Sequence, residues 1–291
     1  MATIATALAD ARQRLAAVST SASLDAQLLL AHVLAVSRAH IIAHPEKSLS
    51  PIQVEAFEQL LRRREQGEPV SYLFGRREWY DREMIVSPAV LIPRPETELL
   101  LEDALAFAQA RRGESAAQML TAVDVGTGSG ALAVTFKALT QTAIVYAVDL
   151  STDALEVARR NAEAQQAEVH FLQGDLLLPL IERDIRVDLV MANLPYIPTE
   201  EVPTLEVSRF EPHLALDGGA DGLVLVRRLL AQLPQVIQPG ALALLEIGAG
   251  QGEAALEAVY QTLRPQRLLR PLQAFVRRDY AGHDRILTLR F

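Results

Sequence analysis

The chain has 291 residues and a formal net charge of −8, from 28 Lys and Arg against 36 Asp and Glu. This length favours two domains, and a hydrophobic fraction of 50% is enough for ordinary cores and excludes a disordered chain. The acidic balance argues against broad binding to nucleic-acid backbones, and the absence of Cys excludes disulfides, thiolate zinc sites and cysteine nucleophiles.

The start of the chain carries no signal for secretion. Its first residues lack the positively charged region and the apolar core that a signal peptide needs. The longest uncharged stretch near the N-terminus, residues 26–37, contains His32 and is too short to span a bilayer. We therefore expect a cytoplasmic protein that does not contact membranes, with a monomer as the default state.

Residues 1–70 have the pattern of a helical domain without strands. Apolar residues recur at helical spacing over residues 4–18 and 24–36. A third helix should start after Ser50, because Ser50 and Gln53 form a capping box around a Pro at the first helical position. The Gly and Pro that close this region predict the end of that helix.

Two features of the helical domain resemble binding sites only superficially. The arginines of residues 62–64 alternate with acidic residues along the helix, which is typical of a solvated face rather than of a binding patch. His40 and His44 are four residues apart, but no third metal ligand accompanies them. We therefore expect no metal site.

Residues 71–95 change character, and we interpret them as a β-hairpin linker. The residues that suggest short strands are Trp79, Tyr80, Ile85, Val86, Val90 and Ile92. A helix is then expected from about Glu96 to Arg111, ended by Gly113. This helix opens the second domain, residues 96–291.

From residue 120 onward, strand-like and helical segments alternate. The strand-like runs are 120–125, 143–149, 169–172, 187–192 and 241–247, and the helical runs are 131–139, 152–164, 223–233 and 252–263. This alternation predicts an α/β fold, a parallel sheet with helices on both faces. Ligands of such folds bind beyond the carboxyl ends of the strands, so the residues that follow each strand are the candidates for a site.

A glycine-rich turn follows the first of these strands. Its residues, called here the first glycine turn, are Gly126, Thr127, Gly128, Ser129 and Gly130. Glycines permit a tight turn and let a ligand approach the backbone. The spacing G-x-G-x-G fits a diphosphate less well than G-x-G-x-x-G does, so a nucleoside cofactor without phosphates, such as S-adenosylmethionine, is favoured. The alternative is a turn that only packs a helix onto the sheet.

Acidic residues follow the second and third strands. Asp149 lies 23 residues after Gly126, where an acid can accept hydrogen bonds from ribose hydroxyls, although a helix-capping role is the alternative. Asp175 either accepts from the exocyclic amine of adenine or caps a short turn. Residues 248–252, the second glycine turn, also stand between a strand and a helix, but no suitably placed acid follows them. We therefore predict that the second turn only packs.

The fourth strand ends in the most specific motif of the chain, Asn193-Leu194-Pro195-Tyr196. This tetrapeptide is similar to the (Asn/Asp)-Pro-Pro-Tyr signature of S-adenosylmethionine-dependent enzymes that methylate planar nitrogens. These enzymes include amino-methyltransferases that act on adenine or cytosine and the HemK/PrmC family of glutamine methyltransferases. The segments that further resemble the HemK/PrmC family are residues 69–79, 91–98, 209–212, 217–219, 245–246 and 278–280. Together they cover about residues 69–291.

The resemblance to the HemK/PrmC family implies a fold and an activity. The fold would be a Rossmann-like class I S-adenosylmethionine-dependent methyltransferase domain, preceded by a small helical domain that docks the substrate and by the hairpin linker. The substrate would be the glutamine of the Gly-Gly-Gln motif in bacterial peptide chain release factors, methylated at its side-chain amide with S-adenosylmethionine as cofactor. No direct contact with nucleic acid is expected.

The same motif predicts how an amide is held. The side-chain oxygen of Asn193 and, as the family implies, the backbone carbonyl of Leu194 would accept the two N–H groups of the amide. Pro195 completes the loop, and the ring of Tyr196 would flank the amide. The chain departs from the family at Leu194, where Pro is usual, and at Leu176, where an aromatic residue often lies near the adenine.

Three other functions remain open from the sequence. An enzyme that methylates adenine or cytosine would flip the base into the same pocket. A dehydrogenase would use a dinucleotide at the glycine turn. A non-catalytic adaptor would bind the cofactor or a release factor and transfer nothing, because Leu194 had altered the pocket.

Overall fold

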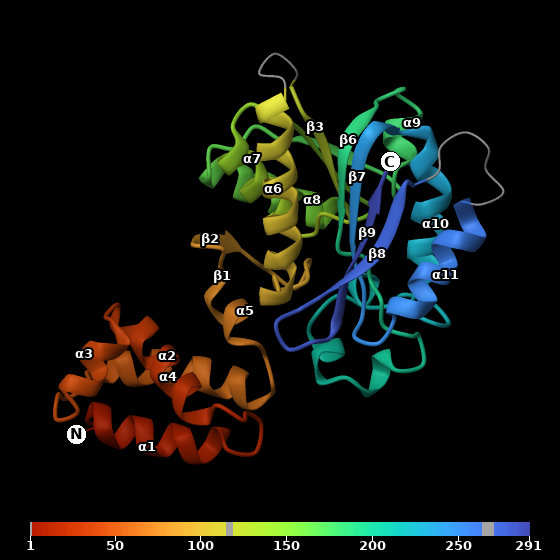
Figure 1. The fold of residues 1–291 in the computed structure, drawn as a ribbon. Coiled ribbons are helices and arrows are strands. Elements are labelled where there is room, and N and C mark those ends of the chain that lie inside the picture. Colours follow the sequence, from red (N-terminus) through yellow and green to blue (C-terminus); the bar gives the residue numbers. More distant parts are fainter. Residues whose placement is uncertain (1, 115–118, 264–270) are drawn as a thin grey trace. The chain divides into compact units, whose positions relative to one another are not determined.

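The computed structural model describes residues 2–114, 119–263 and 271–291 (Figure 1). The chain divides into two compact units, Met1–Arg76 and Arg77–Phe291. Each unit has a hydrophobic core of its own. No helix among the described residues is long and apolar enough to cross a membrane, and no group of metal-ligating side chains within them could hold a metal ion.

The first unit consists of helices, as predicted. They are α1 (Ile4–Leu15), α2 (Ala22–Leu34), α3 (Arg38–Ala43), α4 (Pro51–Glu65) and α5 (Val70–Phe74). Their apolar faces form a core that includes Leu15, Leu29 and Leu61. Helix α4 begins where the capping box predicts, because the Ser50 hydroxyl accepts from the Gln53 N–H and the Gln53 side chain accepts from the Ser50 N–H.

Two details of the first unit differ from the prediction. Helix α5 occupies residues that we assign to the hairpin linker from sequence, and like α3 it is too short to show a helical period. Arg62 and Arg63 are exposed, but Arg64 is largely buried and donates from Nε to Asp25 at 2.8 Å. The expected solvated face is therefore wrong for Arg64, which joins α4 to α2.

The second unit opens with the predicted hairpin, β1 (Arg76–Trp79) and β2 (Arg82–Ile85). Val90 and Ile92, which we expect in strands, lie instead in an irregular segment and are buried. The backbone N–H of Ile92 donates to the Glu211 carboxylate at 3.1 Å rather than to a neighbouring strand. A distant side chain thus takes the place of the strand partner that the pattern suggests.

The rest of the second unit is built on a seven-stranded sheet in the order β5-β4-β3-β6-β7-β9-β8. Its strands are β3 (Thr121–Val125), β4 (Ile144–Asp149), β5 (His170–Gln173), β6 (Val187–Ala192), β7 (Ile237–Glu246), β8 (Gln273–Arg278) and β9 (Asp284–Arg290). Strands β3 to β7 are parallel, as the alternation predicts. Strands β8 and β9 at one edge were not predicted, and β9 pairs antiparallel with both β7 and β8.

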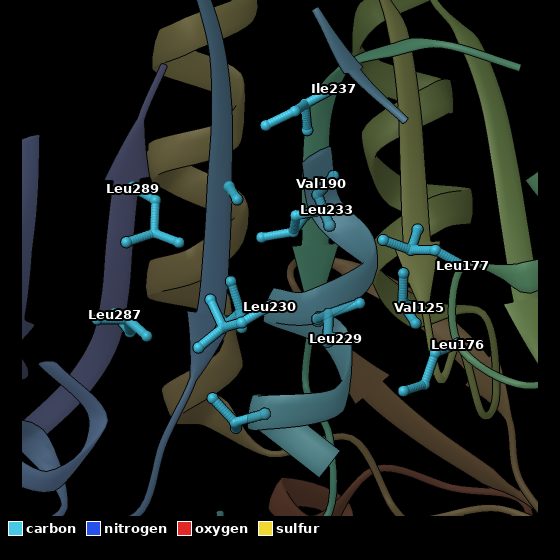
Figure 2. Close-up of a cluster of buried hydrophobic side chains, with 14 of the residues drawn as sticks. Val125, Leu176, Leu177, Val190, Leu229, Leu230, Leu233, Ile237, Leu287 and Leu289 are labelled. Atoms are coloured by element: carbon cyan, nitrogen blue, oxygen red, sulfur yellow. The ribbon is translucent and has the colours of Figure 1, made fainter. Parts of the chain in front are cut away.

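Helices cover both faces of this sheet (Figure 1). They are α6 (Glu98–Glu114), α7 (Ala131–Thr140), α8 (Thr152–Ala164), α9 (Leu178–Ile181), α10 (Val224–Gln232) and α11 (Gly252–Leu263). Ala122 packs in the core shared with α6 and α7, whereas its neighbour Val123 packs in the core shared with α10 and α11. Figure 2 shows the latter core, in which Leu229 and Leu230 lie over the sheet. Successive strand residues thus serve opposite faces.

Short 3₁₀ helices complete the fold. They are η1 (Pro95–Thr97), η2 (Val202–Thr204), η3 (Glu206–Arg209), η4 (His213–Ala215) and η5 (Leu233–Gln235). Because η1 precedes α6, that helix begins at Glu98 rather than at Glu96, and it extends through Gly113, its expected end. Strand β7 begins at Ile237, before the expected Ala241. The predicted elements of the sheet region are therefore confirmed, with several ends displaced.

Candidate active site

A cavity of about 310 Å³ lies where β3, β4, β5 and β6 end. The residues from the sequence analysis that line it are Gly126, Thr127, Gly128, Ser129, Asp149, Asp175, Leu176, Asn193, Leu194 and Pro195. The fold thus brings together residues from four strand ends. Gly130 and Tyr196, which we also expect at the site, are not among the lining residues.

The first glycine turn approaches the Asn193 loop. Gly126, Gly128 and Gly130 all have positive φ, which side-chain-bearing residues rarely adopt. A Cβ on Gly126 would lie 3.0 Å from Leu194 Cδ2, whereas a Cβ on Gly128 would meet nothing within 4 Å. A Cβ on Gly130 would lie 3.0 Å from that of Ala158, so this glycine packs the turn onto α8.

Asp149 holds the first glycine turn and the start of α8. One carboxylate oxygen accepts from the Gly128 N–H at 2.8 Å, and the other accepts from the Ser151 N–H at 2.9 Å. The cap of α8 itself is the Ser151 hydroxyl, which accepts from the Ala154 N–H. Burial raises the Asp149 pKa, and these backbone hydrogen bonds oppose the shift. Each oxygen keeps a further lone pair for a ligand hydroxyl.

Asp124, near the end of β3, is a site residue that the sequence analysis does not single out. Its Oδ2 accepts from the Thr127 hydroxyl at 2.6 Å and from the Ala133 N–H at 3.2 Å. Its Oδ1 is buried and lacks a partner in the described part of the chain, although the residue lines the cavity. Burial raises its pKa to about 7. An unsatisfied buried acceptor of this kind suits a ligand donor.

The end of β5 contributes an ion pair and an aliphatic wall. The Asp175 carboxylate accepts from the guanidinium of Arg228 on α10, so the short-turn cap we considered is not its side-chain contact. Leu176 has a φ of +54° and packs with Val125 and Leu177 in the core (Figure 2). At the end of β5 the cavity is therefore lined by Leu176 rather than by an aromatic ring.

The loop after β6 is anchored on both sides. Asn193 donates from Nδ2 to the Thr97 hydroxyl at 2.9 Å, and the Tyr196 carbonyl accepts from Gln251 Nε2 at 2.9 Å. Gly218 packs directly against the backbone of this loop, because a Cβ there would lie 2.7 Å from the Pro195 carbonyl oxygen. Burial raises the Tyr196 pKa to about 12, so the phenol stays protonated at neutral pH.

Thr97 connects the loop to the end of β7. Its hydroxyl donates to Glu246 Oε2 at 2.7 Å, and both residues are buried. Burial raises the Glu246 pKa to about 7, whereas the Thr97 hydrogen bond and the charge of Arg285 lower it. The sequence analysis quotes both residues within family-like segments but assigns neither a role.

Two further anchors lie at the edge of the site. Arg94 donates to the buried Glu211 carboxylate at 2.7 Å, while the Trp79 indole donates to the Arg94 carbonyl at 2.8 Å. The buried Asn161 of α8 donates to the Ser129 carbonyl at 2.8 Å and makes two hydrogen bonds with the backbone of Ile85. The rarity of Asn, which occurs only twice in the chain, is the one sequence signal for Asn161.

The second glycine turn does not line the cavity, as predicted. Its two outer glycines lie against other residues of the chain. The Gly248 N–H donates to Gln251 Oε1 at 2.8 Å, and the Gly252 N–H donates to the Asp284 carboxylate at 3.1 Å. A Cβ on Gly252 would lie 2.6 Å from Asp284 Oδ2.

Comparison with known proteins gives two family matches. Residues 6–75 match the PrmC N-terminal domain, and residues 122–209 match a methyltransferase domain. A protein of Moorella thermoacetica named release factor glutamine methyltransferase is 40% identical, over 97% of this chain and 96% of that protein. Proteins of the same name from Bordetella pertussis (41%, over 90% and 93%) and Bacillus subtilis (36%, over 90% and 89%) are similar in extent.

The solved structures support the fold alone. The human methyltransferase 10 domain containing protein has a TM-score of 0.51 and 17% identity, over 73% of this chain and 90% of that chain. A methyltransferase from Pyrococcus furiosus has a TM-score of 0.50 and 15% identity, over 72% and 89%.

Proposed function

Since the chain belongs to the release factor glutamine methyltransferase family, we propose that it methylates the side-chain amide of a glutamine in bacterial peptide chain release factors. The glutamine is that of the Gly-Gly-Gln motif. One observation carries the proposal: the Asn193 loop and the first glycine turn line one cavity and approach each other, with Leu194 beside Gly126. An amide held by the loop is therefore adjacent to a cofactor held by the turn.

S-adenosylmethionine, the cofactor, supplies a methyl group on a sulfonium, which a nitrogen lone pair can attack. The residues present fit such a molecule. The first glycine turn offers backbone without Cβ atoms, and the Asp149 carboxylate has lone pairs left for ribose hydroxyls. The unpartnered Oδ1 of Asp124 suits an ammonium group, and Leu176 with Asp175 borders the adenine.

The Asn193 loop orients the glutamine amide. In the described part of the chain, the Asn193 side-chain oxygen and the Leu194 carbonyl accept no hydrogen bond, so both are available for the two amide N–H groups. This arrangement aligns the nitrogen lone pair, and alignment of this kind contributes as much as about 7–11 kcal/mol in favourable cases. Transfer would form the bond from nitrogen to the methyl carbon while the bond from that carbon to sulfur breaks and leaves a neutral thioether. The nitrogen would then lose one proton to water, so no strong base is needed.

Tyr196 helps to hold the loop through its backbone. It is not among the residues that line the cavity, and its place beside the amide stays a prediction. The Tyr196 carbonyl is bonded to Gln251, and a Cβ on Gly222 would lie 2.2 Å from that carbonyl oxygen. These contacts keep the loop in place where Leu194 replaces the usual Pro.

The partners follow from the same family membership. The helical first unit and the hairpin are proposed to dock the release factor, and the enzyme is proposed to act as a monomer without direct contact to nucleic acid. The names of the relatives do not favour the alternative function, methylation of adenine or cytosine.

The decisive experiment supplies S-adenosylmethionine with a labelled methyl group together with purified bacterial release factor, and then maps the labelled peptide by mass spectrometry. Label on the Gly-Gly-Gln peptide is expected, and none on a release factor in which that glutamine is replaced by alanine. Asn193→Ala should keep cofactor affinity within about twofold and lose transfer by about a hundredfold or more, as a lost transition-state hydrogen bond does. Transfer to DNA or RNA with none to release factor would favour the alternative.

A further inference from the structure

Three side chains form a buried polar chain between segments that are distant in sequence. Asn193 follows β6, Thr97 ends η1 and Glu246 ends β7. The Asn193 amide nitrogen lies 2.9 Å from the Thr97 hydroxyl oxygen, which lies 2.7 Å from Glu246 Oε2. Thr97 and Glu246 are 5% and 1% exposed, so water does not compete for the bond between them, whereas Asn193 is half-buried at the cavity.

The direction of each hydrogen bond follows from the chemistry of the groups. An ionised carboxylate only accepts, so the single proton of the Thr97 hydroxyl is committed to Glu246. The Thr97 oxygen can then only accept from Asn193, which requires the NH₂ side of that amide to face Thr97. If the amide turned over, the oxygens of Asn193 and Thr97 would face each other without a proton between them.

This order leaves the Asn193 oxygen as the acceptor at the cavity. We propose that Thr97 and Glu246 are positioning residues that fix the side-chain amide of Asn193 with its oxygen available to an N–H of the substrate amide. The identity of that substrate rests on the proposed function, but the orientation of Asn193 does not. Neither Thr97 nor Glu246 is required to touch the substrate.

The charge of Glu246 decides the direction of the two hydrogen bonds that join Asn193, Thr97 and Glu246. The charged and titratable groups that act on Glu246 are Arg285 of β9, Glu96 of η1 and the phenol of Tyr196. A protonated Glu246 can donate to Thr97, which frees the Thr97 proton to point at Asn193 and lets that amide turn over. The pKa near 7 places this change within reach of ordinary buffers.

The first test replaces the hydroxyl and keeps the shape. Thr97→Val should lower kcat by about tenfold or more, with cofactor affinity within about twofold, whereas Thr97→Ser restores the hydroxyl and most of the rate. The matched control is Thr288→Val on β9, because the Thr288 hydroxyl is also buried but has no partner among the described residues. Equal rate losses in Thr97→Val and Thr288→Val would overturn the proposal.

The second test observes Asn193 directly, without cofactor or substrate. The chain has two Asn residues, so labelling with [¹⁵N]Asn gives two side-chain NH₂ signals, and Asn193→Ala identifies the signal of Asn193. Thr97→Val should shift that signal and speed its hydrogen exchange, while the Asn161 signal stays in place and Thr288→Val moves neither. An Asn193 signal that is unchanged in Thr97→Val would overturn the proposal.

The pH profile provides a third readout. In the wild type, kcat/KM should fall as pH decreases through about 7, because Glu246 becomes neutral. Glu246→Gln should remove the part of this fall that Glu246 causes, since its amide oxygen still accepts from Thr97 but does not titrate. The part that comes from Asp124, whose pKa is also about 7, should remain. An unchanged profile contradicts the role of Glu246. If the wild type methylates no release factor but the Asn193 signal responds as described, the proposed function fails and the positioning inference is upheld.

Discussion

The two glycine turns have nearly the same sequence pattern, yet only one of them lines the cavity. Each follows a buried parallel strand that carries a buried acid, Asp124 in β3 and Glu246 in β7, and each precedes a helix. In each turn the two outer glycines lie against other residues, whereas a Cβ on the middle glycine, Gly128 or Gly250, would meet nothing within 4 Å. The turns differ in their surroundings: the first lines the cavity at the strand ends, whereas the second is bonded to the side chains of Gln251 and Asp284. A glycine-rich turn therefore makes a site only together with the strand ends and loops around it.

The largest difference in cofactor binding should appear when the acid that supports each turn is removed. Asp149 accepts from Gly128, and Asp284 accepts from Gly252, so Asp149→Ala and Asp284→Ala are matched changes. Asp149→Ala should weaken S-adenosylmethionine binding by about 10–100-fold, because charge-assisted hydrogen bonds are worth about 1.5–3 kcal/mol. Asp284→Ala should leave cofactor binding unchanged. Isothermal titration calorimetry measures both, and similar losses would contradict the distinction between the turns.

A smaller difference should separate Gly128→Ala from Gly250→Ala. Both glycines have positive φ, and a Cβ on either would meet nothing within 4 Å, so each variant should lose about 1–2 kcal/mol of stability from backbone strain. Only Gly128→Ala places a methyl group in a residue that lines the cavity, and it should weaken cofactor binding by about tenfold. Urea unfolding and cofactor titration measure the two effects separately. Equal cofactor affinities would show that the space at Gly128 is not used.

The smallest expected effect concerns Asp124, the buried acid of β3 that precedes the first glycine turn. Burial raises the folded-state pKa of Asp124 from 3.8 to about 7, so between these values the folded chain holds a proton that the unfolded chain releases. The free energy of unfolding should therefore decrease as pH rises, by about 1 kcal/mol from Asp124 between pH 6 and 7. In Asp124→Asn this contribution disappears. Subtracting the pH dependence of the variant from that of the wild type then removes the contributions of the other titrating groups. Identical slopes in urea unfolding without cofactor would show that Asp124 does not titrate there.

Local signals predicted the elements that they specify. The spans of α8, β6 and α11 match the expected ones residue for residue. The two helices have a clear helical period, and β6 is a short, mostly apolar run that is buried throughout. Strands β8 and β9 were missed: most of Gln273–Arg278 is exposed or half-exposed and has no alternating apolar face. Val90 and Ile92 gave a wrong prediction for the opposite reason, because both are buried without belonging to a strand. The backbone N–H of Ile92 donates instead to Glu211, far along the chain.

The site was predictable only in part. The rule that ligands bind beyond strand ends led to Asp149 and Asn193, which do line the cavity. The rule does not foresee which distant side chains meet. Thr97 and Glu246 are separated by 149 residues, and their hydrogen bond depends on how α6, which follows η1, packs against β7. Such contacts follow from tertiary packing and leave no local pattern.

Besides supporting the first glycine turn, the Asn161 side chain forms hydrogen bonds with the backbone of the short hairpin. Its side-chain amide pairs with both the N–H and the carbonyl of Ile85, at 2.7 and 2.9 Å, as a neighbouring peptide unit would. A two-stranded ribbon exposes unpaired backbone that invites another chain to add a strand. At Ile85 that position is already occupied, so one buried amide protects the ribbon against edge-to-edge aggregation.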